Sequence, residues 1–280
     1  MSRIIFTVES ENPVALQEYL KNNCKVSRRL IQKLKNTDGG ITCNGGFVRT
    51  VDTVHQGDII EFNINDENEI EPNGNLRAEI AFENESIVIF DKPSGMPVHP
   101  SVRHRNDTLG NLFAYLYPDL TFRPVNRLDK DTSGLCIVAK NPYAANLIQG
   151  NCKKVYFAAV HGIIKGNGVI NAPIAREKES IIVRCVRDDG QYAVTYYKNI
   201  KSNEKYTLLE INLETGRTHQ IRVHFAYIGN PLAGDDLYGG KRDDISRQAL
   251  HCGKISFCLP ETDENITVSS ELPYDINSLF

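Results

Sequence analysis

The residues Val125–Gly134, near the middle of the chain, place two acids and two bases within a few positions and end in Thr-Ser-Gly. An apolar run, Leu135–Ala139, follows directly and predicts a buried strand. Asp, Ser and Gly favour turns, because their side chains bond nearby backbone amides or, for glycine, because positive φ is tolerated. We therefore expect Asp129 and Asp131 in a tight loop that enters a strand. Loops on a rigid sheet often carry catalytic groups, although a solvated turn would have the same composition.

The composition is that of a globular protein without a membrane segment. The chain has 280 residues, of which 41% are hydrophobic and 24% are charged, which is ordinary for a globular domain. No apolar stretch approaches the roughly 20 residues that span a bilayer, and nothing resembles a signal peptide. The seven cysteines are scattered, without paired spacing or a cysteine–histidine cluster for zinc. We expect a cytoplasmic protein without a structural metal.

Charge is distributed unevenly along the chain. The net charge of −3 argues mildly against a nucleic-acid partner. Six bases and no acid lie between Lys21 and Lys35, however, whereas acids gather at 66–85 and at 261–275. A local basic face on an acidic protein is compatible with phosphate binding.

The first 63 residues are predicted to form a small unit of two helices followed by tight hairpins. Val14–Leu20 has apolar residues at helical spacing, and Ser27 is a suitable N-cap for a helix over Arg28–Lys35. Asn44-Gly45 is a hairpin signal. This order resembles the alpha-L RNA-binding fold, found in a small-subunit ribosomal protein and in many RNA-modifying enzymes. The RNA-binding residues that the resemblance implies are Lys25, Ser27, Arg28, Arg29, Lys33 and Asn44. A solvated helix whose bases only maintain solubility is the alternative.

A polar stretch over 64–78 has the composition of a linker, and 79–280 is predicted to be a second, larger domain. Within it, strands are predicted at Ile87–Phe90, Val155–Val160, Tyr192–Tyr197 and Tyr206–Leu213, and helices at Leu109–Tyr117 and His219–Ile228. The alternation in the strand 206–213 predicts a sheet with one buried face. On the helix that begins at His219, the predicted buried stripe is Ile221, Phe225 and Ile228. The expected fold is α+β, a largely antiparallel sheet with a few flanking helices.

Two further clusters could carry chemistry. His219 and Arg222 lie three residues apart on a predicted helix and so share one face. Because the start of a helix does not favour a cation, we expect an anionic partner for Arg222 from elsewhere in the chain. Lys153–Tyr156 places two cations beside an aromatic ring, which suits a stacked base with phosphates nearby. An exposed arginine and a core tyrosine are the alternatives.

Three known motifs are matched only in part. Asp129-Lys130-Asp131 resembles the D-x-D of magnesium-dependent phosphatases of the haloacid dehalogenase type, but it lacks the apolar strand before it and the Thr or Val after it. Asp131-Thr132-Ser133-Gly134 departs from the Asp-Thr-Gly of aspartic proteases and has no second copy. Gly239–Arg242 lacks the glycine spacing and the Ser or Thr of a phosphate loop. We therefore set these three classes aside.

An ordered set of motifs resembles the RluA-type pseudouridine synthases. The central motif is Arg127-Leu128-Asp129-x-x-Thr132-Ser133-Gly134-Leu135. The others are Asp91-Lys92-Pro93-x-Gly95, Lys154-x-Tyr156, Thr215-Gly216-Arg217-Thr218-His219-Gln220-Ile221-Arg222-Val223-His224, Gly234-Asp235 and Leu250-His251. They follow the order of the family. Asn126 stands where the family usually has His. An alpha-L domain in front of the catalytic domain is also familiar in this family.

The resemblance implies an enzyme that isomerises uridine in RNA to pseudouridine without a cofactor or a metal. It implies that Asp129 is the nucleophile, that Tyr156 packs on the target base and that Arg222 pairs with Asp129. The residues implied to bind the substrate are Arg127, Lys154, Arg217, His219 and Gln220. The expected partner is RNA, large-subunit ribosomal RNA ahead of transfer RNA, bound by a monomer. The alternatives are a non-catalytic RNA-binding or ribosome-assembly factor and, third, a metal-dependent phosphatase.

Overall fold

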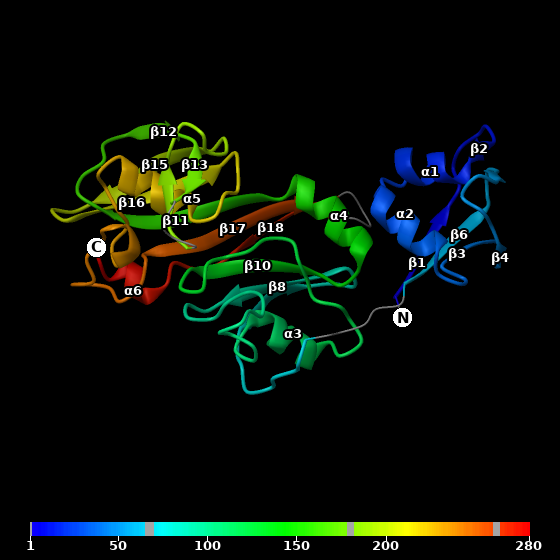
Figure 1. Cartoon of the computed structure of the whole chain (residues 1–280), viewed down its shortest axis with the longest axis horizontal. Helices are drawn as coiled ribbons and strands as arrows, with labels where there is room; N and C mark the ends of the chain where they lie inside the picture. Colours follow the sequence, from blue (N-terminus) through cyan, green and yellow to red (C-terminus); the bar gives the residue numbers. More distant parts are fainter. Residues whose placement is uncertain (1, 65–69, 178–181, 260–263) are drawn as a thin grey trace.

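The structure is a computed structural model that describes residues 2–64, 70–177, 182–259 and 264–280. A small N-terminal unit lies beside a large unit built on a long sheet (Figure 1). Each unit has its own cluster of buried apolar side chains. In Figure 1 the small unit, in blue, lies next to helix α4 (Pro142–Asn151) at one end of the large sheet.

The small unit combines a four-stranded sheet with two helices. Its elements are β1 (Ser2–Thr7), β2 (Val14–Ala15), α1 (Leu16–Asn22), α2 (Arg28–Lys35), β3 (Ile41–Cys43), β4 (Gly46–Phe47), β5 (Thr53–Val54) and β6 (Ile59–Ile64). The antiparallel order of the sheet is β1-β6-β3-β4. The first helix begins at Leu16 rather than at the predicted Val14, because the backbone of Val14 and Ala15 pairs with β5.

Local signals in the sequence account for the second helix and the hairpin. Ser27 caps α2 as predicted, since its Oγ accepts a hydrogen bond from Leu30 N at 3.2 Å. Asn44 and Gly45 have positive φ angles of 51° and 76°, as a two-residue turn between β3 and β4 requires. The three buried residues of α2 pack into the core of the small unit. The basic residues of α2 therefore lie on its exposed face.

The large unit is organised around a 10-stranded sheet. Its strands are β7 (Glu79–Glu83), β8 (Ile87–Lys92), β9 (Arg123–Pro124), β10 (Ser133–Ala139), β11 (Lys153–His161), β12 (Asn167–Asn171), β15 (Val194–Ser202), β16 (Tyr206–Leu213), β17 (Leu250–Cys258) and β18 (Asn265–Ser269). The order is β12-β15-β16-β11-β17-β10-β8-β7, with β18 beside β17 and β9 beside β10. Among the strand pairs of the described residues, only β10 and β17 run parallel. The predicted α+β fold is confirmed.

Helices and one separate hairpin flank this sheet. They are α3 (Leu109–Leu116), α4, the hairpin strands β13 (Ile174–Arg176) and β14 (Arg184–Val186), α5 (Gln220–Tyr227), the short 3-10 helix η1 (Asp236–Tyr238) and α6 (Tyr274–Asn277). The hairpin and α5 lie at the β15–β16 end of the sheet, whereas α3 lies at the β8 end (Figure 1). Of these flanking elements, α3 and α5 were predicted from the sequence, whereas α4, β13, β14, η1 and α6 were not.

Two predictions of burial are wrong in part. Leu208 of β16 points away from the predicted buried face, yet it is buried in a cluster with Ile276 of α6. The first half of β16 is therefore covered on both faces. Ile221 and Phe225 of α5 are buried as predicted, but Ile228 is 37% exposed, because it follows the last helical residue.

The domain boundaries drawn from composition, with a linker over 64–78, stay a prediction. Residues 65–69 of that linker lie outside the described residues. Ile70 and Leu76, from its second half, pack against the core of the large unit. The chain has therefore joined the packing of the large unit by residue 70.

The two units touch at α4. The ring centres of Phe6 in β1 and Tyr143 in α4 are 5.3 Å apart, in an edge-to-face contact. Asn146 of α4 donates a hydrogen bond from Nδ2 to Lys25 O at 3.2 Å. Lys25 precedes α2 by three residues, so this bond ties the start of the basic helix to the large unit.

Candidate active site

The loop before β10 (126–133) is fastened to that strand at its start. Asn126 is buried, and its Nδ2 donates to Leu135 O at 3.1 Å. Its Oδ1 accepts from Ile137 N at 2.8 Å. Both ends of the Asn126 amide are thus hydrogen-bonded to the backbone of β10. Asn126 is the residue that stands where the family usually has His.

Side chains from distant segments hold the middle of this loop by its carbonyl groups. The buried Lys92 ammonium donates to Lys130 O at 3.1 Å. Arg247 Nη1 and Ser94 Oγ donate to Asp131 O at 3.2 and 3.1 Å. Burial lowers the pKa of Lys92 to about 8. Because these bonds go to the backbone, the loop keeps its shape whatever its side chains bind.

The end of the loop packs tightly against β17. Gly134 has a φ of 111°, and a Cβ there would lie 2.4 Å from Cys252 O, so only glycine fits. Ser133 Oγ lies 3.0 Å from His251 Nδ1, and His251 Nε2 lies 3.1 Å from Ser270 Oγ. Burial lowers the pKa of His251 to about 4, so this imidazole is neutral at pH 7 and bridges two strands.

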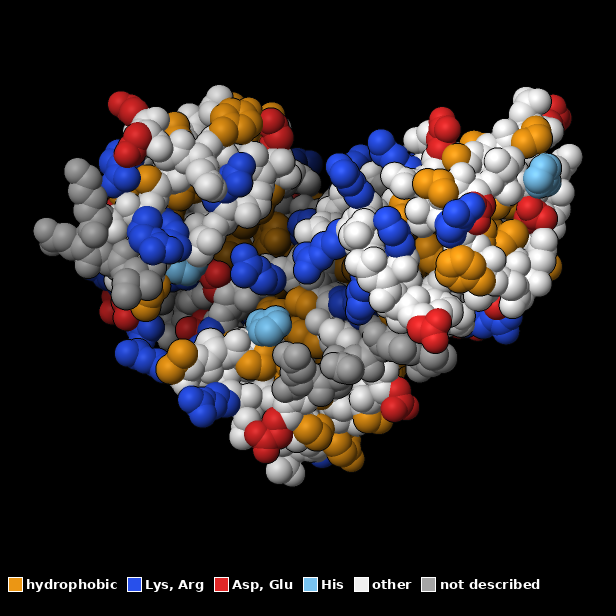
Figure 2. Space-filling model, turned by 45° about the vertical axis from the view of Figure 1, so that its right-hand side comes forward, with side chains coloured by type: hydrophobic (Ala, Val, Ile, Leu, Met, Phe, Trp, Pro, Cys, Tyr) orange, Lys and Arg blue, Asp and Glu red, His pale blue; other side chains and the backbone are white. Residues whose placement is uncertain are grey.

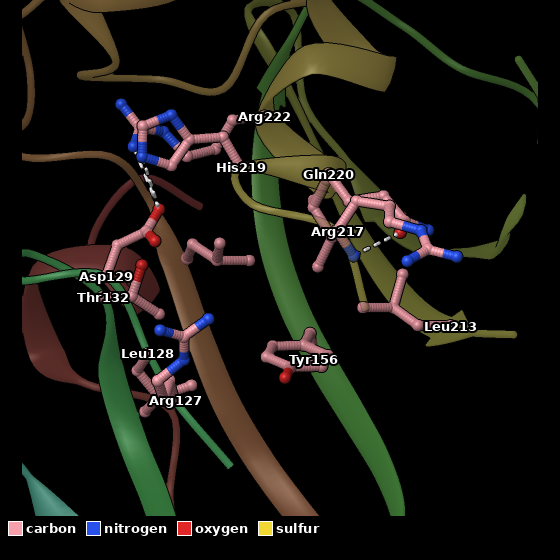
Figure 3. A pocket seen from close by; sticks show the side chains of 12 residues that line it. Arg127, Leu128, Asp129, Thr132, Tyr156, Leu213, Arg217, His219, Gln220 and Arg222 are labelled. Carbon is pink, nitrogen blue, oxygen red and sulfur yellow. Dashed lines mark hydrogen bonds and ion pairs between the residues drawn. The ribbon is translucent and has the colours of Figure 1, made fainter. Parts of the chain in front are cut away.

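An ion-pair chain fixes the Asp129 carboxylate at the mouth of a cavity (Figure 3). Asp129 Oδ2 accepts a hydrogen bond from Arg222 Nη1 at 3.0 Å, while the Asp129 side chain stays 29% exposed. Arg222 Nε and Nη2 donate to the two carboxylate oxygens of Asp235 at 2.6 and 2.7 Å. Arg222 and Asp235 are both buried. The bidentate pair holds the guanidinium plane and leaves one nitrogen directed at Asp129.

Arg222 therefore has two anionic partners, Asp235 and Asp129, where the sequence predicted one. Burial lowers the pKa of Arg222, but hydrogen bonds and charge from Asp235 and Asp129 outweigh it and raise this pKa above its ordinary value. Asp235 belongs to a motif recognised in the sequence, yet no role was assigned to it. The pairing could not be found locally, because Asp235 reaches Arg222 only through the loop that follows α5.

His219 lies against the same oxygen of the Asp129 carboxylate as Arg222. It has a left-handed backbone, with a φ of 57°, at the N-cap of α5. Its Nε2 is 3.7 Å from Asp129 Oδ2, and its Nδ1 is 2.8 Å from Tyr238 Oη. Burial lowers the pKa of His219. The Tyr238 ring also lies against Arg222, whose guanidinium carbon is 5.0 Å from the ring centre.

Tyr156 lies across the cavity from Asp129 (Figure 3). The cavity has a volume of about 70 Å³, and its lining residues are Arg127, Leu128, Asp129, Thr132, Tyr156, Leu213, Arg217, His219, Gln220, Ile221, Arg222 and Leu250. The Tyr156 side chain is buried on β11, and burial raises its pKa well above the ordinary value. The phenol is therefore neutral at pH 7. One wall of the cavity is apolar and aromatic, and the other carries the carboxylate.

Gln220 and Arg217 shape the loop before α5. Gln220 Oε1 accepts from Arg217 N and from Thr215 Oγ1, both at 2.9 Å. Its Nε2 donates to Val194 O at 3.0 Å and to Thr195 Oγ1 at 3.1 Å. Because both ends of its amide are bonded to protein groups, Gln220 positions this loop. The Arg217 side chain remains exposed at the rim.

The remaining residue implied to bind substrate, Lys154, does not line the cavity. It lies two positions before Tyr156 on β11 and so on the same face of the sheet. Its Nζ donates to Cys152 O at 3.1 Å. Lys154 therefore lies between the cavity and the end of the sheet that meets the small unit.

The residues implied to bind RNA in the small unit fall into two groups. Ser27 caps α2, and Asn44 accepts from Ile59 N and donates to Asp58, both at 2.8 Å. The exposed residues are Lys25, Arg28, Arg29 and Lys33. In Figure 2, Lys and Arg side chains gather on both sides of the hollow between the two units.

Within the described residues, no group of three His, Cys, Asp or Glu side chains is arranged to hold a metal ion. No described helix is both long and apolar enough to cross a bilayer.

Comparison with known proteins identifies the family. The model of the RNA pseudouridylate synthase family matches residues 86–227. The uncharacterized RNA pseudouridine synthase YjbO of Bacillus subtilis is 38% identical over 269 residues, which cover 91% of this chain and 94% of that protein. Ribosomal large subunit pseudouridine synthase D of Pseudomonas aeruginosa is 37% identical over 266 residues, 85% of this chain and 82% of that protein.

A solved structure has the same fold. Human RNA Pseudouridylate Synthase Domain Containing 1 superposes with a TM-score of 0.61 and 24% identity, over 73% of this chain and 87% of that chain. The family model and the two relatives confirm the RluA-type resemblance and the predicted enzyme class, an isomerase that forms pseudouridine in RNA. The chain belongs to the RNA pseudouridylate synthase family.

Proposed function

We propose that Asp129 is the nucleophile of uridine isomerisation in this protein. The observation that carries the proposal is the ion-pair chain in which buried Asp235 orients Arg222 and Arg222 bonds a partly exposed Asp129. An arginine stays charged at all ordinary pH values, so Arg222 offers the Asp129 carboxylate a permanent positive partner at the mouth of the cavity. Arg222 and His219 both contact Asp129 Oδ2, and no hydrogen bond to Oδ1 occurs among the described residues, so Oδ1 can turn towards a sugar.

The reaction breaks the bond between the ribose C1′ and N1 of uracil and forms a bond between C1′ and C5. C5 loses a proton and N1 gains one, so the product is an isomer of the substrate. A carboxylate can trap or stabilise the electron-poor C1′, as in retaining glycosidases. No second carboxylic acid is required, because the detached uracil ring itself stabilises negative charge and is rejoined rather than released. The cavity must exclude water, since hydrolysis would otherwise compete.

We propose that Tyr156 packs on the target base and that Arg127, Arg217 and His219 bind the substrate around it. Withdrawing a base from its stack costs a few kcal/mol, and stacking on an aromatic ring returns roughly 1–3 kcal/mol. A neutral, buried tyrosine is suited to that contact. The cavity of about 70 Å³ is small beside the roughly 300–1,000 Å³ of whole-ligand pockets, and we propose that the base enters it while the rest of the nucleotide lies outside.

The RNA is proposed to be large-subunit ribosomal RNA, with transfer RNA as the second choice. The support is the name of the relative from Pseudomonas aeruginosa, a ribosomal large subunit pseudouridine synthase. The exposed bases of α2, with Lys154, would contact the backbone of this RNA, and the small unit would act as an alpha-L RNA-binding domain. We further propose that the enzyme works as a monomer in the cytoplasm.

Pseudouridine mapping of total RNA tests the proposal. Cells with and without the gene would be compared, and the gene would be restored as wild type, Asp129→Asn or Asp131→Asn. Asp131 is the matched control, because it lies on the same loop but does not line the cavity. We expect one or a few sites to vanish without the gene and to return with wild type and Asp131→Asn only.

Recovery with Asp129→Asn would remove the nucleophile role. An unchanged map in every strain would instead favour a non-catalytic RNA-binding or ribosome-assembly factor. Magnesium addition and chelation, assayed on a phosphate ester, would test the metal-dependent phosphatase at the same time.

A further inference from the structure

A second, larger cavity adjoins the Asp129 site and is rich in arginine. Its volume is about 410 Å³, and its lining residues are Ile174, Ala175, Arg176, Arg184, Asp189, Gly190, Gln191, Arg217 and Thr218. Arg217 lines both cavities. The lining acid, Asp189, forms an ion pair with Arg187, so its charge is already compensated. We call this space the arginine cavity.

Two of its arginines face each other across the hairpin. Arg176 of β13 is the direct register partner of Arg184 of β14, so both side chains lie on the same face of the hairpin. Like charges in directly opposed positions destabilise a strand pair. No hydrogen bond or ion pair of the Arg176 guanidinium occurs among the described residues, and that side chain is exposed. The Arg184 guanidinium donates to Ile182 O at 2.9 Å and to Val183 O at 3.2 Å, so Arg176 is the arginine of this pair that can take up an added anion.

Two hydrogen-bond distances and one longer ion-pair contact connect the arginine cavity to the carboxylate of Asp129. Arg184 N donates to Tyr238 Oη at 3.0 Å, and that oxygen lies 2.8 Å from His219 Nδ1. His219 in turn lies against Asp129. On the other wall, Arg217 is held by its backbone bond to Gln220 and by Nε, which donates to Tyr192 O at 3.0 Å. The cavity is therefore fixed relative to Asp129.

We propose that the arginine cavity binds a backbone phosphate of the nucleotide next to the target uridine, an inference that rests on the proposed function. The small cavity accepts one base, and its rim at Arg217 leads directly into the larger one. Guanidinium groups form paired, charge-assisted hydrogen bonds with phosphate oxygens. A phosphate held there fixes the position of the ribose and so presents its C1′ to Asp129.

Binding is measured with an RNA hairpin whose loop carries one uridine. Asp129→Asn serves as the background, so that no turnover occurs. Adding Arg176→Gln should weaken binding about tenfold, the loss typical of one charge-assisted contact. The slope of log affinity against log salt should fall by about 0.7, the value for one contact to a single strand. Arg242→Gln is the matched control: it removes the same charge, but its residue is exposed, pairs with Asp236 and lines neither cavity.

A neutral methylphosphonate placed at each loop position in turn locates the phosphate. At one position next to the uridine, the methylphosphonate should weaken RNA binding to the background protein. The same RNA should bind the protein that also carries Arg176→Gln as tightly as the unmodified RNA does. Equal losses in the two proteins at every position, or an equal effect of Arg242→Gln, would overturn the inference. A failure of the proposed function would be recognised separately, because Asp129→Asn would then form as much pseudouridine as wild type.

Discussion

The loop that carries Asp129 and helix α2 both contain several charged residues, but the two segments differ in how distant parts of the protein hold them. In the loop, carbonyl groups and side chains are bonded to Lys92, Arg247 and Gln248, which come from distant segments. In α2 the basic side chains are exposed, and within the described residues no hydrogen bond or ion pair engages Arg28 or Arg29. The loop is therefore held in one geometry by internal bonds, whereas Arg28 and Arg29 remain available to the RNA that we propose as their partner.

The difference predicts two kinds of variant. A change in the network under Asp129 should lower the rate of the chemical step and leave RNA affinity nearly unchanged, since a small misplacement of reacting groups is costly. A change on α2 should do the reverse, because phosphate contacts contribute affinity and its salt dependence.

The largest effect is expected at Asp235. Asp235→Asn removes half of the buried pair with Arg222 and should lower kcat about 100-fold, because the guanidinium loses its orientation towards Asp129. Breaking a buried pair should also cost about 3–5 kcal/mol of stability. Single-turnover kinetics and urea unfolding measure both effects. The control is Asp236→Asn, one residue on, since Asp236 is exposed and pairs with Arg242. Equal activity of the two variants would show that Arg222 needs no such support.

His251 should make stability depend on pH. Its pKa is about 4 in the folded protein, against an ordinary 6.5, so the unfolded chain binds more protons between these values. Stability should therefore fall as pH drops from 6.5 to 4, by roughly 3 kcal/mol from this residue. His251→Asn should be less stable at pH 7, but the gap to wild type should close towards pH 4. Urea unfolding across this range measures the gap; a constant gap would contradict the prediction.

A smaller effect is expected at the C-terminal helix. Asp275 of α6 pairs with Arg247 at 2.6 Å, and Arg247 holds the carbonyl of Asp131. Asp275→Asn should lower kcat by about 3- to 10-fold and stability by about 1 kcal/mol, because the carboxylate is partly exposed. Asp244→Asn is the control, since that acid is also partly exposed and paired, with Lys205. If both variants retain full activity, α6 does not support the loop.

These networks also mark how far the sequence could be interpreted. The loop at Asp129, the cap at Ser27 and the turn at Asn44 follow from neighbouring residues, so local rules found them. Asp235 with Arg222 and Asp275 with Arg247 are joined only by the fold, and no periodicity predicts such pairs. Helix α4 differs, because Asn141 as N-cap and Pro142 in the first turn are local signals that were overlooked.

The burial of β16 also depends partly on local pattern and partly on remote segments. The alternation in β16 correctly predicted the face that carries Leu209 and Ile211. It did not predict that Leu208 is covered, because the covering residue, Ile276, comes from the far end of the chain. The alternation along a strand predicts which residues share a face. Whether one or both faces are buried depends on packing against segments that are remote in sequence.

The smallest effect is expected for a single base on α2. Arg29→Gln should leave kcat unchanged and weaken RNA binding by about 2- to 5-fold, as an exposed charge contact does. The loss should vanish at high salt, where such contacts are screened. Arg49→Gln is the matched control in the same unit, because Arg49 is exposed but already paired with Asp52 at 2.8 Å. Filter binding over a salt series compares the two variants. Parallel salt curves for both would mean that α2 only carries solvated charge, and the contrast between a bonded loop and a free, RNA-facing helix would then hold for the loop alone.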